Sequence, residues 1–216
     1  MPTVAIVGGT GPEGRGLGLR LAIGGYPVII GSREASRGAA AAAALLDVRA
    51  GLPITGATNA EAAREADWVL VALPFEALND TVGPLASAAE GKLVVSVVAP
   101  LAVENGRFKP IALPQGSAAE LVQTLLPKSR VTSAFQNLSA RDLLRPDRVL
   151  EGDVAVCGDD AEARKHTMEL ARAIKDLRPV DAGPLANSRY VEDLTGLLLN
   201  LNRIHKSHAT VRFLGI

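Results

Sequence analysis

Cysteine is almost absent from this 216-residue sequence, which contains only Cys157. A single cysteine cannot form an intramolecular disulfide, and it cannot supply the two or more thiolates of a cysteine-based metal site. We therefore expect a protein that folds without covalent cross-links. The low cysteine content also favours a reducing compartment, the cytoplasm.

A net charge is absent as well, because 23 lysine and arginine residues balance 23 aspartate and glutamate residues. Such a chain has no overall attraction for a nucleic-acid backbone or an anionic membrane surface, so any recognition of charge must be local. No apolar run approaches the ~20 residues of a membrane span, and no basic residue precedes the first apolar run. These absences predict a cytoplasmic protein that binds neither nucleic acid nor membranes.

Short apolar runs rich in β-branched residues alternate with stretches of helical spacing. The first run, Thr3–Val7, ends at glycines and has the composition of a strand buried on both faces of a parallel sheet. This alternation predicts an α/β fold with a Rossmann-type, doubly wound parallel sheet. Further predicted strands are Pro27–Ile30, Ile54–Thr58, Trp68–Leu73, Leu93–Val98, Arg130–Ala134, Asp153–Cys157 and Pro179–Asp181, and predicted helices are Gly16–Ile23, Ala35–Leu46, Glu61–Ala66, Ala161–Leu177 and Tyr190–Ile204.

The second half of the chain predicts a loop, a domain boundary and a broadly apolar helix. Three prolines exclude a continuous helix over Ala99–Gln115, and we expect a loop that covers the sheet edge. Ser117–Glu120 is a capping box that starts the next helix. We place a Rossmann domain over residues 1–134 and a smaller α+β portion over residues 135–216. The leucines of Tyr190–Ile204 predict burial on a broad face, within the fold or in a homodimer.

A glycine motif of the form G-x-G-x-x-G directly follows the first predicted strand and opens a helix. Its residues are Gly9, Thr10, Gly11, Pro12, Glu13 and Gly14. In this context the glycines allow a tight turn and a close approach of pyrophosphate to the amides at the helix N-terminus. The alternative is a glycine-rich turn that only links strand to helix. The strand before and the helix after the motif favour a dinucleotide site.

The second predicted strand ends without the carboxylate that an NAD-specific site uses to bind the ribose hydroxyls. Instead, Ser32 and Arg33 follow, with Arg37 four residues later on the same side of the next helix. A serine hydroxyl and arginine side chains are suited to bind a 2′-phosphate. These residues predict NADP(H), the alternative being that the two arginines form a solvated helix face.

Together with these motifs, further segments make the sequence resemble the NADPH-dependent reductases of coenzyme F420, an 8-hydroxy-5-deazaflavin. They are Leu73–Glu76, Val94–Ser96, Ser117–Glu120, Asp153–Asp160, Leu177–Leu185 and Asn187–Arg189. The resemblance spans nearly the whole chain. Asp181–Leu185 and Asn187–Arg189 are its most specific parts, shared also with related N-terminal domains of membrane-spanning ferric reductases.

The resemblance implies hydride transfer between NADP(H) and F420 as co-substrate, a reaction in which the protein orients the two ring systems and excludes water. No catalytic acid or base is implied. Thr10, Gly11, Pro12 and Glu13 would meet the pyrophosphate, Leu73, Pro74 and Phe75 the adenosine or ribose, Val98 and Ala99 the nicotinamide, and Gln136, Asn137 and Leu138 the deazaflavin.

One departure from the family concerns Gln136, where several members carry a histidine. A glutamine can hydrogen-bond a ring carbonyl, but it carries no charge near neutral pH. The residues therefore also allow an NADPH-dependent reductase of another acceptor, such as a flavin, a quinone or an imine. A third hypothesis is a non-catalytic NADP-binding sensor, because a fold does not determine chemistry.

The remaining polar motifs receive structural interpretations. We expect His166 to lie exposed on a helix surface and Asp159–Asp160 to cap the helix that follows. His205 and His208, in a basic cluster near the C-terminus, either contact an acidic coenzyme tail or form a solvated helix end. Without a neighbouring carboxylate they predict no metal site. No G-x-S-x-G motif supports hydrolysis.

Overall fold

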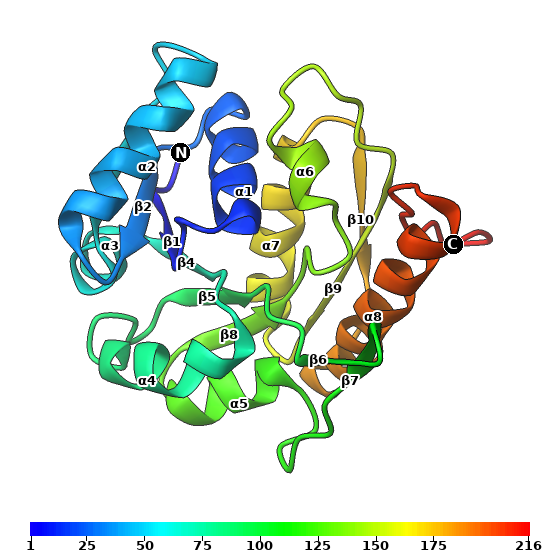
Figure 1. The fold of residues 1–216 in the computed structure, drawn as a ribbon. Helices are drawn as coiled ribbons and strands as arrows, with labels where there is room; N and C mark the ends of the chain where they lie inside the picture. The colour runs from blue at the N-terminus through cyan, green and yellow to red at the C-terminus, as the bar shows by residue number, and fades with distance from the viewer.

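An eight-stranded sheet runs through the computed structural model, which describes residues 1–216 (Figure 1). The strand order is β10-β9-β8-β5-β4-β1-β2-β3. The bounds are Val4–Val7 for β1, Val28–Ser32 for β2, Ile54–Thr58 for β3, Trp68–Val71 for β4, Leu93–Ser96 for β5, Arg130–Ser133 for β8, Gly152–Gly158 for β9 and Leu177–Asp181 for β10. Each predicted strand is present, with bounds shifted by a few residues.

The strands from β3 across to β8 are all parallel, as predicted for a doubly wound sheet. The direction reverses at β9, which pairs antiparallel with β8 through Thr132 and Gly158, and β10 runs parallel to β9. The chain leaves β1 toward β2 on one side and later returns to β4 on the other. The carboxyl ends of β1 and β4 therefore form a topological switch point, where ligands of such sheets bind.

Helices cover both faces of the sheet, because successive side chains of each buried strand point to opposite sides. Ile6 belongs to a buried cluster shared with α1, α2 and α7, and Val7 to a second cluster shared with α3, α4 and α5. None of the helices has the length and apolarity needed to cross a membrane. Their bounds are Pro12–Ile23 for α1, Ala35–Val48 for α2, Asn59–Glu65 for α3, Leu78–Val82 for α4, Ala118–Leu125 for α5, Ala140–Leu143 for α6, Ala161–Ala173 for α7 and Ser188–His205 for α8, with single 3-10 turns at Phe75–Ala77, Gly83–Leu85 and Leu185–Asn187.

The segment Ala99–Gln115, expected to be a loop, contains a β-hairpin instead. Strand β6 (Leu101–Glu104) pairs antiparallel with β7 (Arg107–Pro110). The turn residues Asn105 and Gly106 have φ angles of 49° and 72°, the left-handed backbone that an Asn-Gly hairpin turn requires. The prediction considered only the prolines, whereas the Asn-Gly pair carried the hairpin signal.

Two helix predictions also need correction. The helix expected over Ala161–Leu177 ends at Ala173, because Ile174 has extended backbone angles, with a φ of −88° and a ψ of 109°. Asp176, with a φ of 71°, then turns the chain into β10. Helix α8 is not buried on a broad face within this chain, since Leu197 is 54% exposed and Ile204 is 71% exposed. The other alternative, burial in a homodimer, stays a prediction. The predicted start of α5 at Ser117 is confirmed, because the Glu120 backbone N–H donates to the Ser117 hydroxyl. The second bond of a capping box is absent, since the Glu120 carboxylate accepts from the Ser117 hydroxyl and not from the Ser117 backbone N–H.

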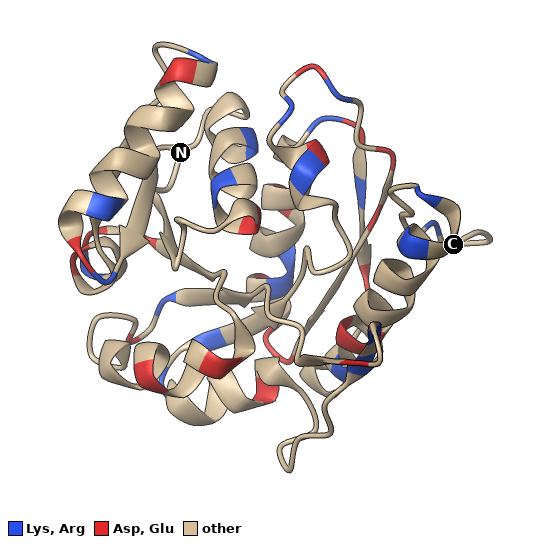
Figure 2. Cartoon of the chain, viewed as in Figure 1, with Lys and Arg blue, Asp and Glu red and all other residues tan.

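Charged residues of both signs are interspersed along the elements in the view of Figure 2. This agrees with the balanced composition of 23 basic and 23 acidic residues.

Candidate cofactor site

The glycine loop after β1 is packed too tightly for side chains. Gly8 has a φ of 72°, and a Cβ placed there would lie 2.2 Å from the Cδ2 of Leu73. A Cβ on Gly14 would lie 2.7 Å from the Cα of Gly9. Helix α1 then begins at Pro12 with no side-chain cap at Gly11, so its first amides remain available to an anion.

Asn59 holds this loop from the side, a role that the sequence did not reveal. Its Oδ1 accepts a hydrogen bond of 3.0 Å from the backbone N–H of Gly8. Asn59 is placed by a capping box in which the Thr58 hydroxyl accepts from the Glu61 backbone N–H. That capping box was recognisable in the sequence as a helix start. Nothing in the sequence connected it with the glycine loop.

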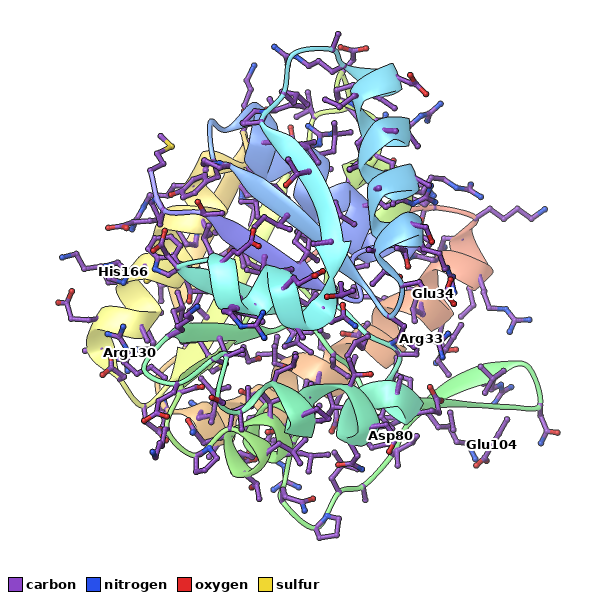
Figure 3. The ribbon with its side chains drawn as sticks, turned by 90° about the vertical axis from the view of Figure 1, so that its left-hand side faces the viewer. Arg33, Glu34, Asp80, Glu104, Arg130 and His166 are labelled. Atoms are coloured by element: carbon purple, nitrogen blue, oxygen red, sulfur yellow. The ribbon has the colours of Figure 1, made fainter.

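A cavity of about 600 Å³ lies beside the glycine loop. Seven residues predicted for NADP(H) line it: Thr10, Gly11, Ser32, Arg33, Arg37, Leu73 and Pro74. The α3 and α4 sides of the cavity add residues that were not predicted, among them Thr58, Asn59, Asp80 and Thr81. Figure 3 shows Arg33 after β2 and Asp80 on α4 on the same side of the molecule.

The cations of this cavity are available to a ligand. Arg33 and Arg37 are exposed, and neither forms an ion pair within the chain. Ser32 is buried at the end of β2. The cavity therefore offers two free guanidinium groups to a phosphate, which fits the 2′-phosphate of NADP(H).

The other predicted contacts do not line this cavity. Phe75 follows β4, and Val98 and Ala99 follow β5, so they lie beyond the carboxyl ends of neighbouring strands. Val98 is buried, while Phe75 and Ala99 are half-buried. Their predicted contacts with adenosine and nicotinamide remain predictions.

The segment after β8 is strained and firmly held. Phe135 is a buried non-glycine residue with a φ of 76°, a conformation that typically costs about 1–3 kcal/mol and clusters at functional sites. Asn137 Nδ2 donates to the Val191 carbonyl oxygen and to the Thr195 hydroxyl of α8, both at 3.0 Å. Helix α8 thus fixes the segment that the sequence predicted to face the second ring system.

The side-chain amide of Gln136 has hydrogen-bond partners at its nitrogen but none at its oxygen. Its Nε2 donates to the Ser133 hydroxyl at 2.8 Å and to the Ser96 carbonyl oxygen at 3.3 Å. Its Oε1 is buried without a hydrogen-bond partner, as is the Ser96 Oγ. Buried polar atoms normally have hydrogen-bond partners, so these two atoms are exceptions within the fold.

Glu13 carries a third buried oxygen without a partner, its Oε1. Burial raises the pKa of this carboxyl from 4.5 to about 8. Glu13 shares one face of α1 with Gly16 and Arg20, at helical spacings of three and seven residues. That face packs on α6, since a Cβ on Gly16 would lie 2.5 Å from the Leu143 Cβ.

Arg20 of α1 binds the backbone of the chain at and after α6. Its guanidinium donates to five backbone carbonyl oxygens, those of Asp142, Leu143, Arg145, Pro146 and Arg148. The residue is only 6% exposed. Sequence reasoning missed it, because a single arginine among apolar helix residues does not reveal partners more than 120 positions away.

A buried carboxyl on α8 joins the C-terminal portion to the N-terminal one. Glu192 is 1% exposed, and its oxygens accept from the backbone N–H groups of Ala118 at 2.7 Å and Ala119 at 3.1 Å, at the start of α5. Burial raises its pKa to about 7, and the two hydrogen bonds oppose the shift. This contact was also missed.

The expectations for the remaining polar residues met different outcomes. His166 is half-buried and stacks on Trp68, with ring centroids 5.0 Å apart, so the prediction of an exposed histidine was wrong. The packing of α7 on the sheet brings the two rings together. Asp160 caps α7 as predicted, whereas Asp159 accepts from Leu185 instead. His208 Nδ1 lies 2.6 Å from the Asp142 carboxylate.

Comparisons with known proteins identify the family to which this chain is similar. The family described as NADP oxidoreductase coenzyme F420-dependent matches residues 3–100. The chain is 42% identical over 214 residues to the F420-dependent NADP reductase of Methanocaldococcus jannaschii, covering 96% of this chain and 95% of that protein. It is 39% identical over 205 residues to that of Methanothermobacter marburgensis, covering 92% of each.

A crystal structure of an Arthrobacter sp. FB24 protein superposes with a TM-score of 0.84 over the full length of both chains. Its sequence identity is 22%, so it supports the fold. The two archaeal relatives establish more than the fold, because their similarity extends over nearly the whole of each chain. The protein belongs to the family of coenzyme F420-dependent NADP oxidoreductases.

Proposed function

We propose that this chain transfers a hydride between NADP(H) and coenzyme F420. The observation that carries the proposal is the cavity beside the glycine loop, with two unpaired arginines and a buried serine, in a chain of this family. Bound NADP(H) and deazaflavin would supply the redox chemistry themselves. The protein then has to bind, orient and exclude water.

Residues of the N-terminal portion would hold NADP(H). The free amides of α1 would face the pyrophosphate, and Arg33, Arg37 and Ser32 would bind the 2′-phosphate. Asn59 would keep the glycine loop in its binding conformation through its hydrogen bond to Gly8. We assign residues 1–134 to this task and residues 135–216 to completing the deazaflavin side.

The acceptor side would rely on hydrogen bonding. The Gln136 Oε1 is a free acceptor for a ring N–H, and the Ser96 hydroxyl is both a donor and an acceptor. Asn137 is engaged with α8 and would act as a support for Gln136. No proton has to be moved by a side chain, so no catalytic acid or base is assigned.

A homodimer is also part of the proposal. Tyr190, Leu194, Leu197, Leu201 and Ile204 follow one another at alternating spacings of four and three residues along α8. This is the spacing of a helix-packing seam, and Tyr190 is 67% exposed within the single chain. Light scattering of the wild type at micromolar concentration should give a dimer. Leu197→Glu should give a monomer, whereas Val48→Glu, on exposed α2, should not.

A cytoplasmic location completes the proposal. The single cysteine is a buried free thiol whose pKa burial raises to about 11, so it would remain unreactive in a reducing compartment. Fractionation of the native host should recover the protein with cytoplasmic markers.

Absorbance tests the reaction directly. Purified protein, NADPH and oxidised F420 are mixed, and the visible band of the deazaflavin is followed, with NADH, FMN and FAD as controls. The proposal predicts bleaching that requires both NADPH and F420. NADPH binding without bleaching would instead support a reductase of another acceptor or a non-catalytic sensor.

A further inference from the structure

We propose that Glu13 contacts the nicotinamide half of NADP(H) as a neutral carboxylic acid and donates its proton in a hydrogen bond to an oxygen of the bound dinucleotide. The inference rests on the proposed NADP(H) site. It assigns to Glu13 a protonation state and a half of the ligand, neither of which the glycine motif specifies.

The position of Glu13 separates it from the adenosine half. Thr10 and Gly11 line the cavity with Arg33, but Glu13 does not. By helical spacing, Glu13 shares a face of α1 with Gly16 and Arg20, and both of these residues contact the segment around α6. Because α1 packs on α6 and the segment Gln136–Leu138 leads into α6, this face of α1 is turned toward the predicted deazaflavin side.

The surroundings of Glu13 favour a neutral group. Its Oε1 is buried and has no donor, and burial is the cause of its raised pKa. A buried carboxylate without a partner is costly, and a pyrophosphate at the same helix end would add repulsion between like charges. A protonated carboxyl removes both penalties. Its O–H is also the only donor that it can offer to phosphate or carboxamide oxygens.

Other charged groups do not account for this state. Those on the elements packed against α1 are Arg15 and Arg20 on α1 itself, Arg33 and Arg37 beside it, Asp47 on α2, Arg141 and Asp142 on α6, and Glu162, Arg164, Lys165, His166, Glu169 and Arg172 on α7, with His208 on the C-terminal tail. None of them contributes to the pKa shift of Glu13. Asp142, from α6, is already paired with His208 and Arg148.

Calorimetric titration of the intact protein with NADP⁺ between pH 7 and pH 9.5 tests the proposal. Because only the neutral form would bind well, the Kd of the wild type should rise about tenfold from pH 7 to pH 9. Glu13→Gln keeps a neutral group of the same shape and should show no such rise. Glu65→Gln removes an exposed carboxyl at the end of α3, and it should behave as the wild type does.

Adenosine 2′,5′-bisphosphate locates the contact, because it lacks the nicotinamide half. Its Kd should not change with pH between 7 and 9.5 in either the wild type or Glu13→Gln. The same pH dependence for the bisphosphate and NADP⁺ would overturn the assignment to the nicotinamide half. An unchanged pH dependence in Glu13→Gln would overturn the role of Glu13.

Proton uptake on NADP⁺ binding tests the neutral state of Glu13 in the wild-type protein. This test requires no variant. Titrations at pH 9 in two buffers of different ionisation enthalpy should reveal uptake of about 0.9 proton per NADP⁺ bound. Binding without uptake would refute a neutral Glu13. If these results hold but F420 is not bleached, the proposed reaction fails and the Glu13 contact stands. The absence of NADP⁺ binding at every pH would overturn both.

Discussion

The two halves of the candidate site are built in different ways. The adenosine half consists of side chains that directly follow β1 and β2, with Arg33 and Arg37 exposed and unpaired. The acceptor half consists of the buried Gln136 and its neighbours, held by α8 from one side and, through α6, by Arg20 from the other. Apart from the hydrogen bond between Asn59 and Gly8, the first half depends on local sequence and charge, whereas the second depends on contacts between distant parts of the chain.

The largest expected effect is a loss of stability when Arg20, which supports the acceptor half through α6, is replaced. Arg20→Met keeps a long apolar stem but leaves five backbone carbonyl oxygens without their donor. We expect the free energy of unfolding to fall by about 3 to 4 kcal/mol, because buried polar groups lose their partners. Urea unfolding measures this value.

The variant Arg20→Met also tests whether ligand binding in the adenosine half is independent of the support of the acceptor half. In the folded fraction, the Kd for adenosine 2′,5′-bisphosphate should stay within about twofold of the wild type, since Arg20 does not line that cavity. Arg64→Ala, at an exposed position on α3, serves as the control for the loss of an arginine. A large loss of bisphosphate affinity with unchanged stability would show that the two halves are not separate.

The next effect concerns the pH dependence of the contact between α8, which supports the acceptor half, and the start of α5. The pKa of Glu192 rises from 4.5 to about 7 on folding, so the folded protein binds this proton more tightly than the unfolded chain. The resulting stabilisation is complete below about pH 4.5 and is lost as the pH rises through about 7. It amounts to roughly 3 kcal/mol at most.

Glu192→Gln should therefore lose less stability than the wild type between pH 5 and pH 8. Urea unfolding at several pH values gives the difference between the two proteins, and any contribution from Glu13 cancels in it. Equal slopes for the wild type and the variant would mean that Glu192 does not hold the proton in the folded state.

In the adenosine half, Arg33→Ala should affect the two nicotinamide dinucleotides differently. Loss of a charge-assisted contact with the 2′-phosphate is expected to weaken NADPH binding by about 2 kcal/mol, or roughly thirtyfold. NADH binding should change little, because NADH has no 2′-phosphate. Fluorescence titration with both dinucleotides gives the ratio, and equal losses would contradict the assignment. Arg49→Ala, beyond the far end of α2, is the matched control.

These two halves also differ in how far the sequence could predict them. The glycine motif, Ser32 and Arg33 each follow a strand with clear composition, so local patterns indicated both the elements and the ligand. Comparisons with relatives confirmed the family that the longer motifs suggested. Asn59 and Glu192 were missed because their partners lie 51 and 74 positions away, and no local pattern specifies such pairs.

The smallest expected effect is at Gln136, where the acceptor half would touch its ligand. Gln136→Leu removes the buried Oε1 and the hydrogen bond to Ser133 but keeps a side chain of similar size. We expect kcat/KM for F420 to fall by about 1 kcal/mol, or roughly fivefold, with the Kd for NADPH unchanged. Gln115→Leu, in an exposed loop, is the control. An equal loss of NADPH affinity would place Gln136 on the dinucleotide side, and the two halves would then meet at this residue.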